Sequence, residues 1–187
     1  MMKQEILNYL TENNIKCLIF DKDGTLTDTS TLWFEPTILV LDELIKRNEM
    51  KLSNIEHDEL FDRLGITETD IIENSVIAAG SVRDMLEVLN EFRAIDIEEN
   101  YDFVVQYFAD YILSHPEKIQ TLGNLKRALG YLREKEYIIA LVTNDSRLPA
   151  EAVLRVAGIG EVFDFVGTTD EFPSKPATDS LHAIQNR

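Results

Sequence analysis

Two carboxylates stand two residues apart at the end of a short apolar run. Asp21 and Asp23 follow the run at residues 16–20, and Gly24 comes next, where it permits an abrupt turn. Two carboxylates this close repel each other unless a cation neutralises them, so the pair indicates a Mg²⁺ site with hard oxygen ligands. The alternative interpretation is a solvated acidic turn, because a chain with 15 aspartates contains about one such pair by chance.

Three further polar residues come after later apolar runs. Thr143 and Asn144 follow residues 137–142, and their hydroxyl and amide groups can bind phosphoryl oxygens without adding charge. Lys175 precedes a proline and could neutralise both a nucleophile and a phosphate. Each feature alone is more typical of an ordinary loop, so their significance depends on whether the fold brings them together.

The elements that must position these residues alternate between strands and helices. Apolar runs predict strands at residues 16–20, 137–142 and 163–167, and periodic apolar positions predict helices before and after the second strand. A helix is expected to begin at Pro149. The middle of the chain shows no convincing strand and instead carries strong helical stripes, above all at residues 82–92.

This order predicts an α/β fold with a Rossmann-like parallel sheet in three layers, α/β/α, and an inserted all-helical domain. The predicted core comprises residues 1–34 and 120–187, and the predicted helical insert comprises residues 35–119. Ligands of such sheets bind beyond the carboxyl ends of the strands. The polar residues named above occupy that position.

Three segments in this order resemble the motifs of the haloacid dehalogenase (HAD) superfamily, which consists largely of phosphatases with an aspartate nucleophile. The segments are residues 20–29, 141–144 and 174–179. The helical insert lies where that family carries its C1-type cap domain. Residues 74–81 are similar to the substrate-facing loop of phosphoglycolate-phosphatase-like members.

The resemblance implies a role for each matching residue. Asp21 would attack phosphorus and form an aspartyl-phosphate, and Asp23 would protonate the leaving alcohol and then activate water. Mg²⁺ would be held by the Asp21 carboxylate and the main-chain carbonyl of Asp23, while Thr143 and Lys175 would complete the catalytic set. The implied substrate-binding residues are Gly24, Thr25, Asn144, Ala79, Gly80 and Ser81.

The expected reaction is hydrolysis of a small phosphorylated metabolite, with phosphoglycolate as the leading substrate. Asp23 argues against dehalogenation, because a halide leaving group needs no proton. Two alternatives remain open: a phosphomutase of the beta-phosphoglucomutase type, and a catalytically silent or truncated protein of the same fold.

One motif of the family has no counterpart. The family's fourth motif, GDxxxD, supplies a further Mg²⁺ ligand and follows the motif lysine by some two dozen residues, whereas this sequence stops at Arg187, 12 residues after Lys175. Without the strand that carries this motif, the strand before Asp21 would be an apolar edge. Either the sequence is a fragment or a truncated gene product, which we favour, or something else covers that edge.

Composition excludes several classes of protein. The chain has 34 acidic and 18 basic residues and a net charge of −16, which argues against binding to nucleic acid or to an anionic membrane. One cysteine, Cys17, allows neither a disulfide framework nor a Cys-rich zinc site. The sequence carries neither a long apolar run nor a signal-peptide pattern, so we expect a cytoplasmic protein.

Three other residues have two interpretations each. Arg83 and Arg147 could reach a substrate carboxylate, although surface ion pairs are favoured. Trp33 lies at the predicted junction of core and insert, where packing is favoured over a role at the substrate entrance.

Overall fold

Three parallel strands form the sheet of the computed structural model, which describes residues 4–28 and 32–186. In the order β1-β2-β3, Leu18 pairs with Ile139 and Leu141 pairs with Val166. Thr29, the last residue of the first motif, lies outside the described residues. The strands are β1 (Cys17–Phe20), β2 (Ile138–Val142) and β3 (Phe165–Gly167).

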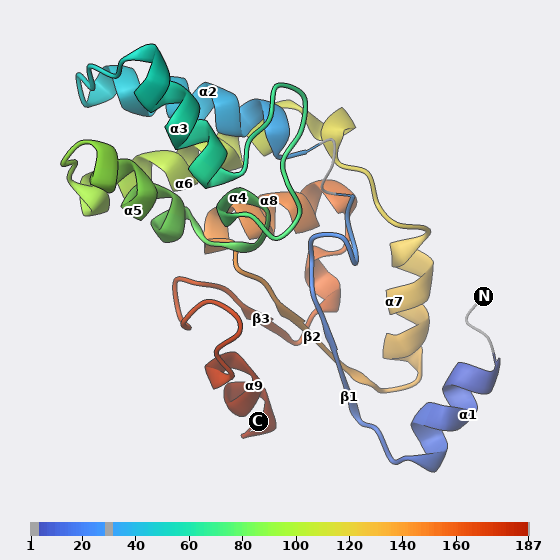
Figure 1. The fold of residues 1–187 in the computed structure, drawn as a ribbon. Coiled ribbons are helices and arrows are strands. Elements are labelled where there is room, and N and C mark those ends of the chain that lie inside the picture. The colour runs from blue at the N-terminus through green and yellow to red at the C-terminus, as the bar shows by residue number, and fades with distance from the viewer. Residues whose placement is uncertain (1–3, 29–31, 187) are drawn as a thin grey trace.

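Helices make up most of the rest of the described chain (Figure 1). Parallel strands need crossover connections, and here helices lie in both connections. No helix among the described residues is long and apolar enough to cross a membrane. The α-helices are α1 (Gln4–Glu12), α2 (Phe34–Arg47), α3 (Asn54–Leu64), α4 (Val76–Ala79), α5 (Val82–Phe92), α6 (Ile97–Ser114), α7 (Leu125–Glu134), α8 (Arg147–Ala157) and α9 (Asp179–Gln185); short 3₁₀ helices are η1 (Pro116–Lys118) and η2 (Gly160–Val162).

The two faces of β2 are both covered. Alternate side chains of a strand point to opposite faces, and Ile139 and Leu141 pack with residues of α7 and α8. Ala140 and Val142 point the other way and pack with Phe165 and the apolar side of α9. Because helices lie on both faces of a parallel sheet, the predicted three-layer α/β/α architecture is confirmed.

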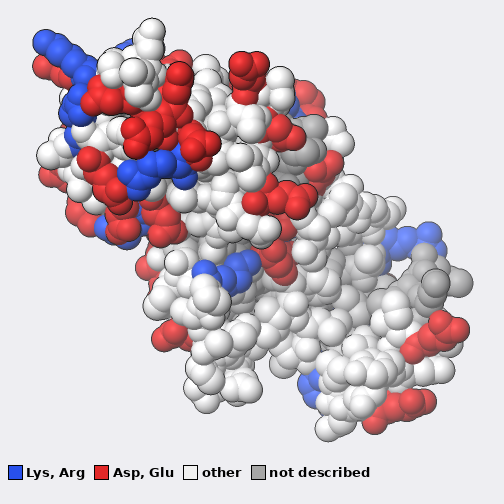
Figure 2. Space-filling model, in the orientation of Figure 1, with Lys and Arg blue, Asp and Glu red and all other residues white. Residues whose placement is uncertain are grey.

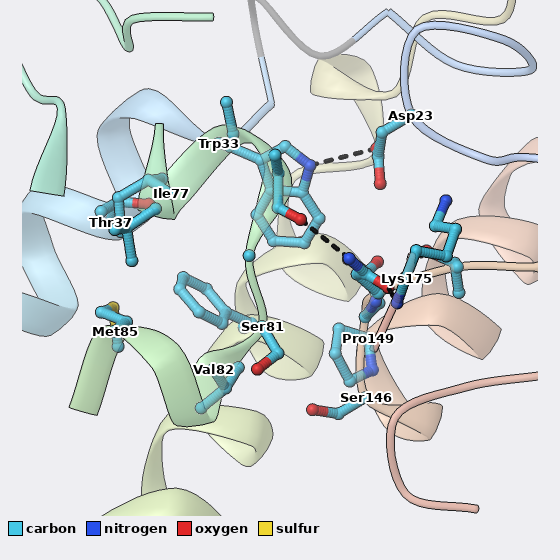
Figure 3. A pocket seen from close by; sticks show the side chains of 18 of the residues that line it. Asp23, Trp33, Thr37, Ile77, Ser81, Val82, Met85, Ser146, Pro149 and Lys175 are labelled. Atoms are coloured by element: carbon cyan, nitrogen blue, oxygen red, sulfur yellow. Dashed lines mark hydrogen bonds between the residues drawn. The ribbon is translucent and has the colours of Figure 1, made fainter. Parts of the chain in front are cut away.

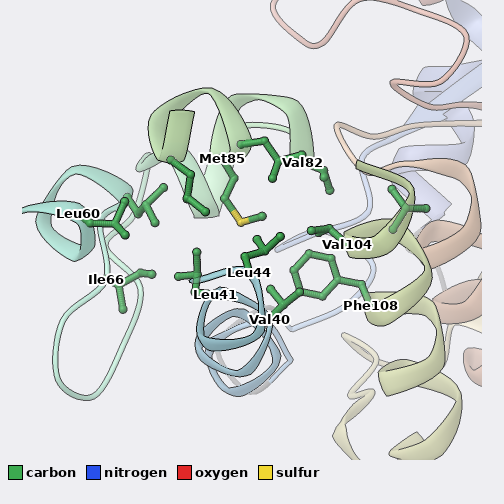
Figure 4. Packing of buried hydrophobic residues seen from close by; sticks show 13 residues of the cluster. Val40, Leu41, Leu44, Leu60, Ile66, Val82, Met85, Val104 and Phe108 are labelled. Carbon is green, nitrogen blue, oxygen red and sulfur yellow. The ribbon is translucent and has the colours of Figure 1, made fainter. Parts of the chain in front are cut away.

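Helices α2 to α6 form a group with its own hydrophobic core (Figure 4). The apolar stripes predicted from sequence meet there: Leu41 and Leu44 of α2 pack with Leu86 and Leu89 of α5, and all four are fully buried. Figure 2 shows acidic side chains gathered over this group on the face in view. The exposed faces of these helices therefore carry charge while the facing stripes stay apolar.

A smaller apolar contact joins this group to the sheet region. Ala109 and Ile112 of α6 pack against Ala152 and Val153 of α8, together with Leu32. Figure 1 shows α8 between the helical group and the sheet. The contact holds α4 and α5 close to the carboxyl ends of β1 and β2. The exact domain boundaries at residues 34/35 and 119/120 stay a prediction.

Several local expectations differ from the structure. β1 is an exception, because it is the apolar edge strand that was expected: among the described strands only β2 pairs with it, and Ile19 is 44% exposed. β3 is shorter than predicted, since Phe163 precedes the paired residues. α8 begins at Arg147, two residues before Pro149, because Ser146 already has the extended backbone of an N-cap.

Candidate active site

A cavity of about 410 Å³ lies between the carboxyl ends of β1 and β2 and the helices α2, α4, α5 and α6 (Figure 3). Because both strands end at the same edge of the sheet, their following residues meet there. Eight of the ten residues predicted to form the site line this cavity: Asp21, Asp23, Ala79, Gly80, Ser81, Thr143, Asn144 and Lys175.

Asp21 and Lys175 form an ion pair at the cavity. The Lys175 Nζ lies 2.6 Å from the Asp21 Oδ1 and 3.5 Å from the carbonyl oxygen of Val142. The two charged side chains are 42% and 39% exposed, so solvent and a ligand can reach both. A lysine here offsets the negative charge of Asp21, which would otherwise repel a phosphate.

Asp23 is held from two sides. The Lys22 Nζ lies 2.7 Å from Oδ1 and 2.6 Å from Oδ2, and the Trp33 indole Nε1 donates a hydrogen bond to Oδ1 at 3.2 Å. The Lys22 ammonium also lies 5.1 Å from the Trp33 ring centroid, within cation–π range. These contacts define where the Asp23 carboxylate points.

Lys22 itself is fully buried, which requires compensation for its charge. Its Nζ lies 2.9 Å from the Asp145 Oδ2 in addition to Asp23. Burial alone would lower the pKa of Lys22, but the carboxylates of Asp145 and Asp23 outweigh it and raise that pKa. Burial raises the pKa of Asp145 to about 6, against the opposing effect of Lys22.

The sequence did not lead us to predict Lys22 or Asp145 as components of the site. The signal that could have indicated them was a lysine between two aspartates and an aspartate directly after Asn144.

Thr143 and Asn144 connect the sheet to the rest of the site. The Thr143 N–H donates to the Gly167 carbonyl at 3.0 Å, which extends the pairing of β2 and β3 to this residue. The Asn144 Nδ2 donates to the Ala79 carbonyl at 2.8 Å, and its Oδ1 accepts from the Lys175 N–H at 2.7 Å. Asn144 therefore links α4 of the helical group to the loop that carries Lys175.

The predicted loop at residues 74–81 contains α4, a single helical turn with Ser75 as its N-cap. Ala79 and Gly80 face the cavity as expected. The Ser81 hydroxyl donates to the Asp84 Oδ2 at 2.7 Å and accepts from the Asp84 N–H, so it caps α5. The Ser81 hydroxyl thus has partners within the protein, and its role in substrate binding stays a prediction.

Gly24 and Thr25 were predicted to bind substrate, but both are exposed and neither lines the cavity. Gly24 adopts a φ of +71° and its N–H donates to the Thr27 carbonyl at 2.8 Å. This left-handed turn directs the chain away from the cavity immediately after Asp23. The role of Gly24 in the structure is to form this turn.

Arg83 and Arg147 form ion pairs away from the cavity. Arg83 makes two hydrogen bonds to Glu98, at 2.9 and 3.2 Å. Arg147 donates to Glu171 at 2.7 Å and to Glu151 at 3.2 Å. The surface pairing favoured from the sequence is confirmed for both.

The donor atoms present fit a magnesium ion. Asp21, Asp23 and Asp145 set three carboxylates against the two ammonium groups of Lys22 and Lys175, so the site favours an added cation. Within residues 4–28 and 32–186, neither these three carboxylates nor any other three His, Cys, Asp or Glu side chains form a group that could hold a metal ion by themselves. Mg²⁺ suits this sparse set, because it usually keeps several waters and needs only one or two carboxylates plus substrate phosphate.

Comparison with known proteins identifies the family. The model of the haloacid dehalogenase-like hydrolases matches residues 15–187, so the chain belongs to this family. The resemblance drawn from three motifs is thereby confirmed.

Individual relatives are more distant. The chain is 24% identical over 164 residues to pyrophosphatase PpaX from Bacillus velezensis, covering 87% of this chain and 63% of PpaX. It thus spans 63% of the length of this curated relative.

Two solved structures share the fold. A predicted phosphoglycolate phosphatase from Haemophilus somnus has a TM-score of 0.53 at 18% identity, covering 91% of this chain and 70% of that one. CbbY from Rhodobacter sphaeroides, as a variant in complex with xylulose-1,5-bisphosphate, has a TM-score of 0.63 at 16% identity, covering 92% of this chain and 72% of CbbY.

Proposed function

We propose that this protein is a Mg²⁺-dependent phosphatase that hydrolyses a small phosphomonoester through an aspartyl-phosphate on Asp21. The observation that carries the proposal is the position of Lys175, whose Nζ lies 2.6 Å from the Asp21 Oδ1 in a cavity that Asp23 and Thr143 also line. Membership of the HAD-like hydrolases supports the same reaction class.

In the first step, a carboxylate oxygen of Asp21 attacks phosphorus, and the bond between phosphorus and the alcohol oxygen breaks. Asp23 donates a proton to the departing alkoxide, which leaves as the neutral alcohol. The Lys175 ammonium offsets the negative charge that gathers where Asp21 meets the phosphate, and the Thr143 hydroxyl can donate to a phosphoryl oxygen.

In the second step, water attacks the phosphorus of the aspartyl-phosphate. Asp23, now a carboxylate, accepts a proton from this water, and the bond between phosphorus and the Asp21 oxygen breaks to release inorganic phosphate. Two displacements at a positioned carboxylate replace one difficult attack of water on a phosphomonoester.

The Asp21 carboxylate and the main-chain carbonyl of Asp23 would hold the magnesium ion. When bound, it would supply positive charge to the transferring phosphoryl group. The chain's own groups then have to position the ester and move the proton. Phosphoglycolate, the substrate expected from sequence, is one compound to assay.

The test is phosphate release from a panel of phosphomonoesters by the 187-residue chain, with and without Mg²⁺. We expect turnover that chelation removes, that Mg²⁺ restores, and that Asp21→Asn lowers by about 1,000-fold or more, because the nucleophile is gone. Asp58→Asn makes the same chemical change at a side chain that is 86% exposed, and is expected to leave turnover unchanged.

Two outcomes would contradict the proposal. One is the absence of phosphate release from every compound in the panel. The other is release that persists undiminished in Asp21→Asn. Interconversion of sugar 1-phosphates and 6-phosphates without net phosphate release would instead support the phosphomutase alternative.

A further inference from the structure

The two sides of the cavity differ in chemical character (Figure 3). The side formed by the strand ends carries all of the charge: Asp21, Asp23, Asp145 and Lys175. The opposite side is built by helices of the helical group and by the residues just before α2. Its apolar lining residues are Trp33, Val76, Ile77, Val82, Met85 and Phe108.

Among the described residues, no lysine or arginine lines the apolar side of the cavity. Among the described residues that line the cavity, Lys175 is the only lysine or arginine, and its ammonium already pairs with Asp21 where the phosphoryl group would bind. The nearby Arg83 and Arg147 are taken by Glu98 and by Glu171 with Glu151. A second anionic group on a substrate would therefore meet no cation on this side.

Four side chains on the lining carry hydroxyl groups, those of Thr37, Ser81, Thr143 and Ser146, and two of them are engaged with other side chains. The Ser81 hydroxyl caps α5 through Asp84, and the Ser146 Oγ lies 3.0 Å from the hydroxyl of Tyr101. A carboxylate placed on this side would lose its hydration without gaining a charged partner, which is strongly unfavourable. An alkyl or aryl group would instead release water from apolar surface, which is favourable.

We propose that this cavity selects phosphomonoesters whose alcohol part is uncharged and mostly apolar, and that it discriminates against phosphorylated carboxylic acids such as phosphoglycolate. The inference rests on the proposed phosphatase function and adds the class of alcohol. The volume of about 410 Å³ falls within the range of roughly 300–1,000 Å³ common for small-molecule sites, so it leaves room beside the phosphate.

The first experiment compares two esters of equal length, ethyl phosphate and phosphoglycolate, by kcat/KM. We expect ethyl phosphate to be preferred by about 10-fold or more. Butyl and hexyl phosphate should be better still, by about two- to four-fold per methylene, as expected for apolar burial. A preference for phosphoglycolate over ethyl phosphate would overturn the inference, and so would a lack of dependence on alkyl length.

The second experiment adds a cation to the apolar side. Ile77→Lys on α4 is expected to shift the ratio of kcat/KM values toward phosphoglycolate by about 10-fold or more, since the carboxylate gains a partner. Ala79→Lys, at an exposed position on the same turn, is a second variant that disturbs packing less. Ile72→Lys, at a side chain that is 49% exposed and outside the cavity lining, is the matched control and should leave the ratio unchanged.

The activated ester p-nitrophenyl phosphate separates failure of this inference from failure of the proposed function. If p-nitrophenyl phosphate, phosphoglycolate and all the alkyl esters are inert, the phosphatase proposal itself is wrong. If it is hydrolysed in an Asp21-dependent way but neither lysine variant shifts the ratio, the phosphatase proposal stands and the inference about the alcohol is overturned.

Discussion

The helical segment and the sheet region divide the charge of this protein unequally. Residues 35–119 carry 20 acidic and 7 basic side chains, a net charge of −13, whereas residues 1–34 and 120–187 carry 14 acidic and 11 basic side chains, a net charge of −3. The net charge of −16 is therefore mainly a property of one region. The net charge of the whole protein therefore does not predict whether an anion can bind at the carboxyl ends of the strands.

Inside the cavity, the charged side chains come from the sheet region and not from the more acidic helical segment. The acidic helical region contributes apolar side chains there, and the nearly neutral sheet region contributes every charged one. The helices bury their apolar stripes and expose their charges outward, as amphipathic helices do. The strand ends bring polar loop residues to one edge. The comparison assigns proton transfer and phosphate binding to the sheet side, and contact with the alcohol to the helical side.

The largest expected effect sharpens the contrast between two lysines of the sheet region. Lys22→Met leaves the Asp23 and Asp145 carboxylates without their buried partner, so we expect the free energy of unfolding to fall by about 3–5 kcal/mol in urea denaturation. The double variant Lys22→Met/Asp145→Asn should regain part of the lost free energy of unfolding. A loss below about 1 kcal/mol, the range typical of exposed pairs, would contradict the structural role of Lys22.

Lys175→Met should show the opposite pattern. Its pair with Asp21 is about 40% exposed, so the free energy of unfolding should change by less than about 1 kcal/mol. In contrast, kcat/KM for phosphate release should fall by about 100-fold or more, because the phosphate loses its cation. Lys51→Met, at an exposed position of the helical segment, is the control for a general effect of charge. Equal losses of kcat/KM in Lys175→Met and Lys51→Met would contradict the assignment of phosphate binding to the sheet region.

Trp33 connects the two regions, since its indole donates to Asp23 and its ring contacts Phe108 of α6 edge-on at 5.3 Å. Trp33→Phe keeps the apolar contact and removes the hydrogen bond. We expect kcat to fall by about five- to ten-fold, equivalent to a hydrogen bond of about 1 kcal/mol. Trp33→Leu, which also removes the aromatic ring, should lower kcat further than Trp33→Phe. An unchanged kcat in both Trp33→Phe and Trp33→Leu would show that Trp33 has only a packing role.

The smallest expected effect lies in the helical segment, at a residue outside the cavity lining. Hydrogen bonds from the Ser53 N–H and hydroxyl, together with Arg93, lower the pKa of Glu56 to about 2 from an ordinary value of 4.5. A pKa lowered by folding stabilises the protein above the unfolded value, and this stabilisation is lost as pH falls from about 4.5 toward about 2.

Glu56→Gln should therefore make the Tm less sensitive to pH between 5 and 2 than it is in the wild type. Activity at neutral pH should be unchanged. Glu59→Gln, at an exposed position of the same helix, is the matched control. A wild-type Tm with the same acid dependence as the Glu56→Gln variant would show that this cap contributes nothing.

Local patterns predicted most of the elements well. α5 and α6 follow strong three-to-four spaced stripes, and β2 follows a run of apolar residues that is buried on both faces. α4 was missed because four residues are too few to show a helical period. An apolar run by itself does not indicate how many neighbours a strand has, so the edge position of β1 was expected only from the comparison with the family's motifs.

By itself, the sequence determined the order of strands and helices, the carboxylate pair at the end of β1, and the three motifs that point to the family. These are local features, and residues within a few positions of one another specify them. Tertiary structure alone decided three features of the site. They are the pairing of Lys175 with Asp21 across 154 positions, the burial of Lys22 between Asp23 and Asp145, and the apolar character of one side of the cavity. The physical reason is that contacts between distant side chains depend on how the helical group packs against the strand ends.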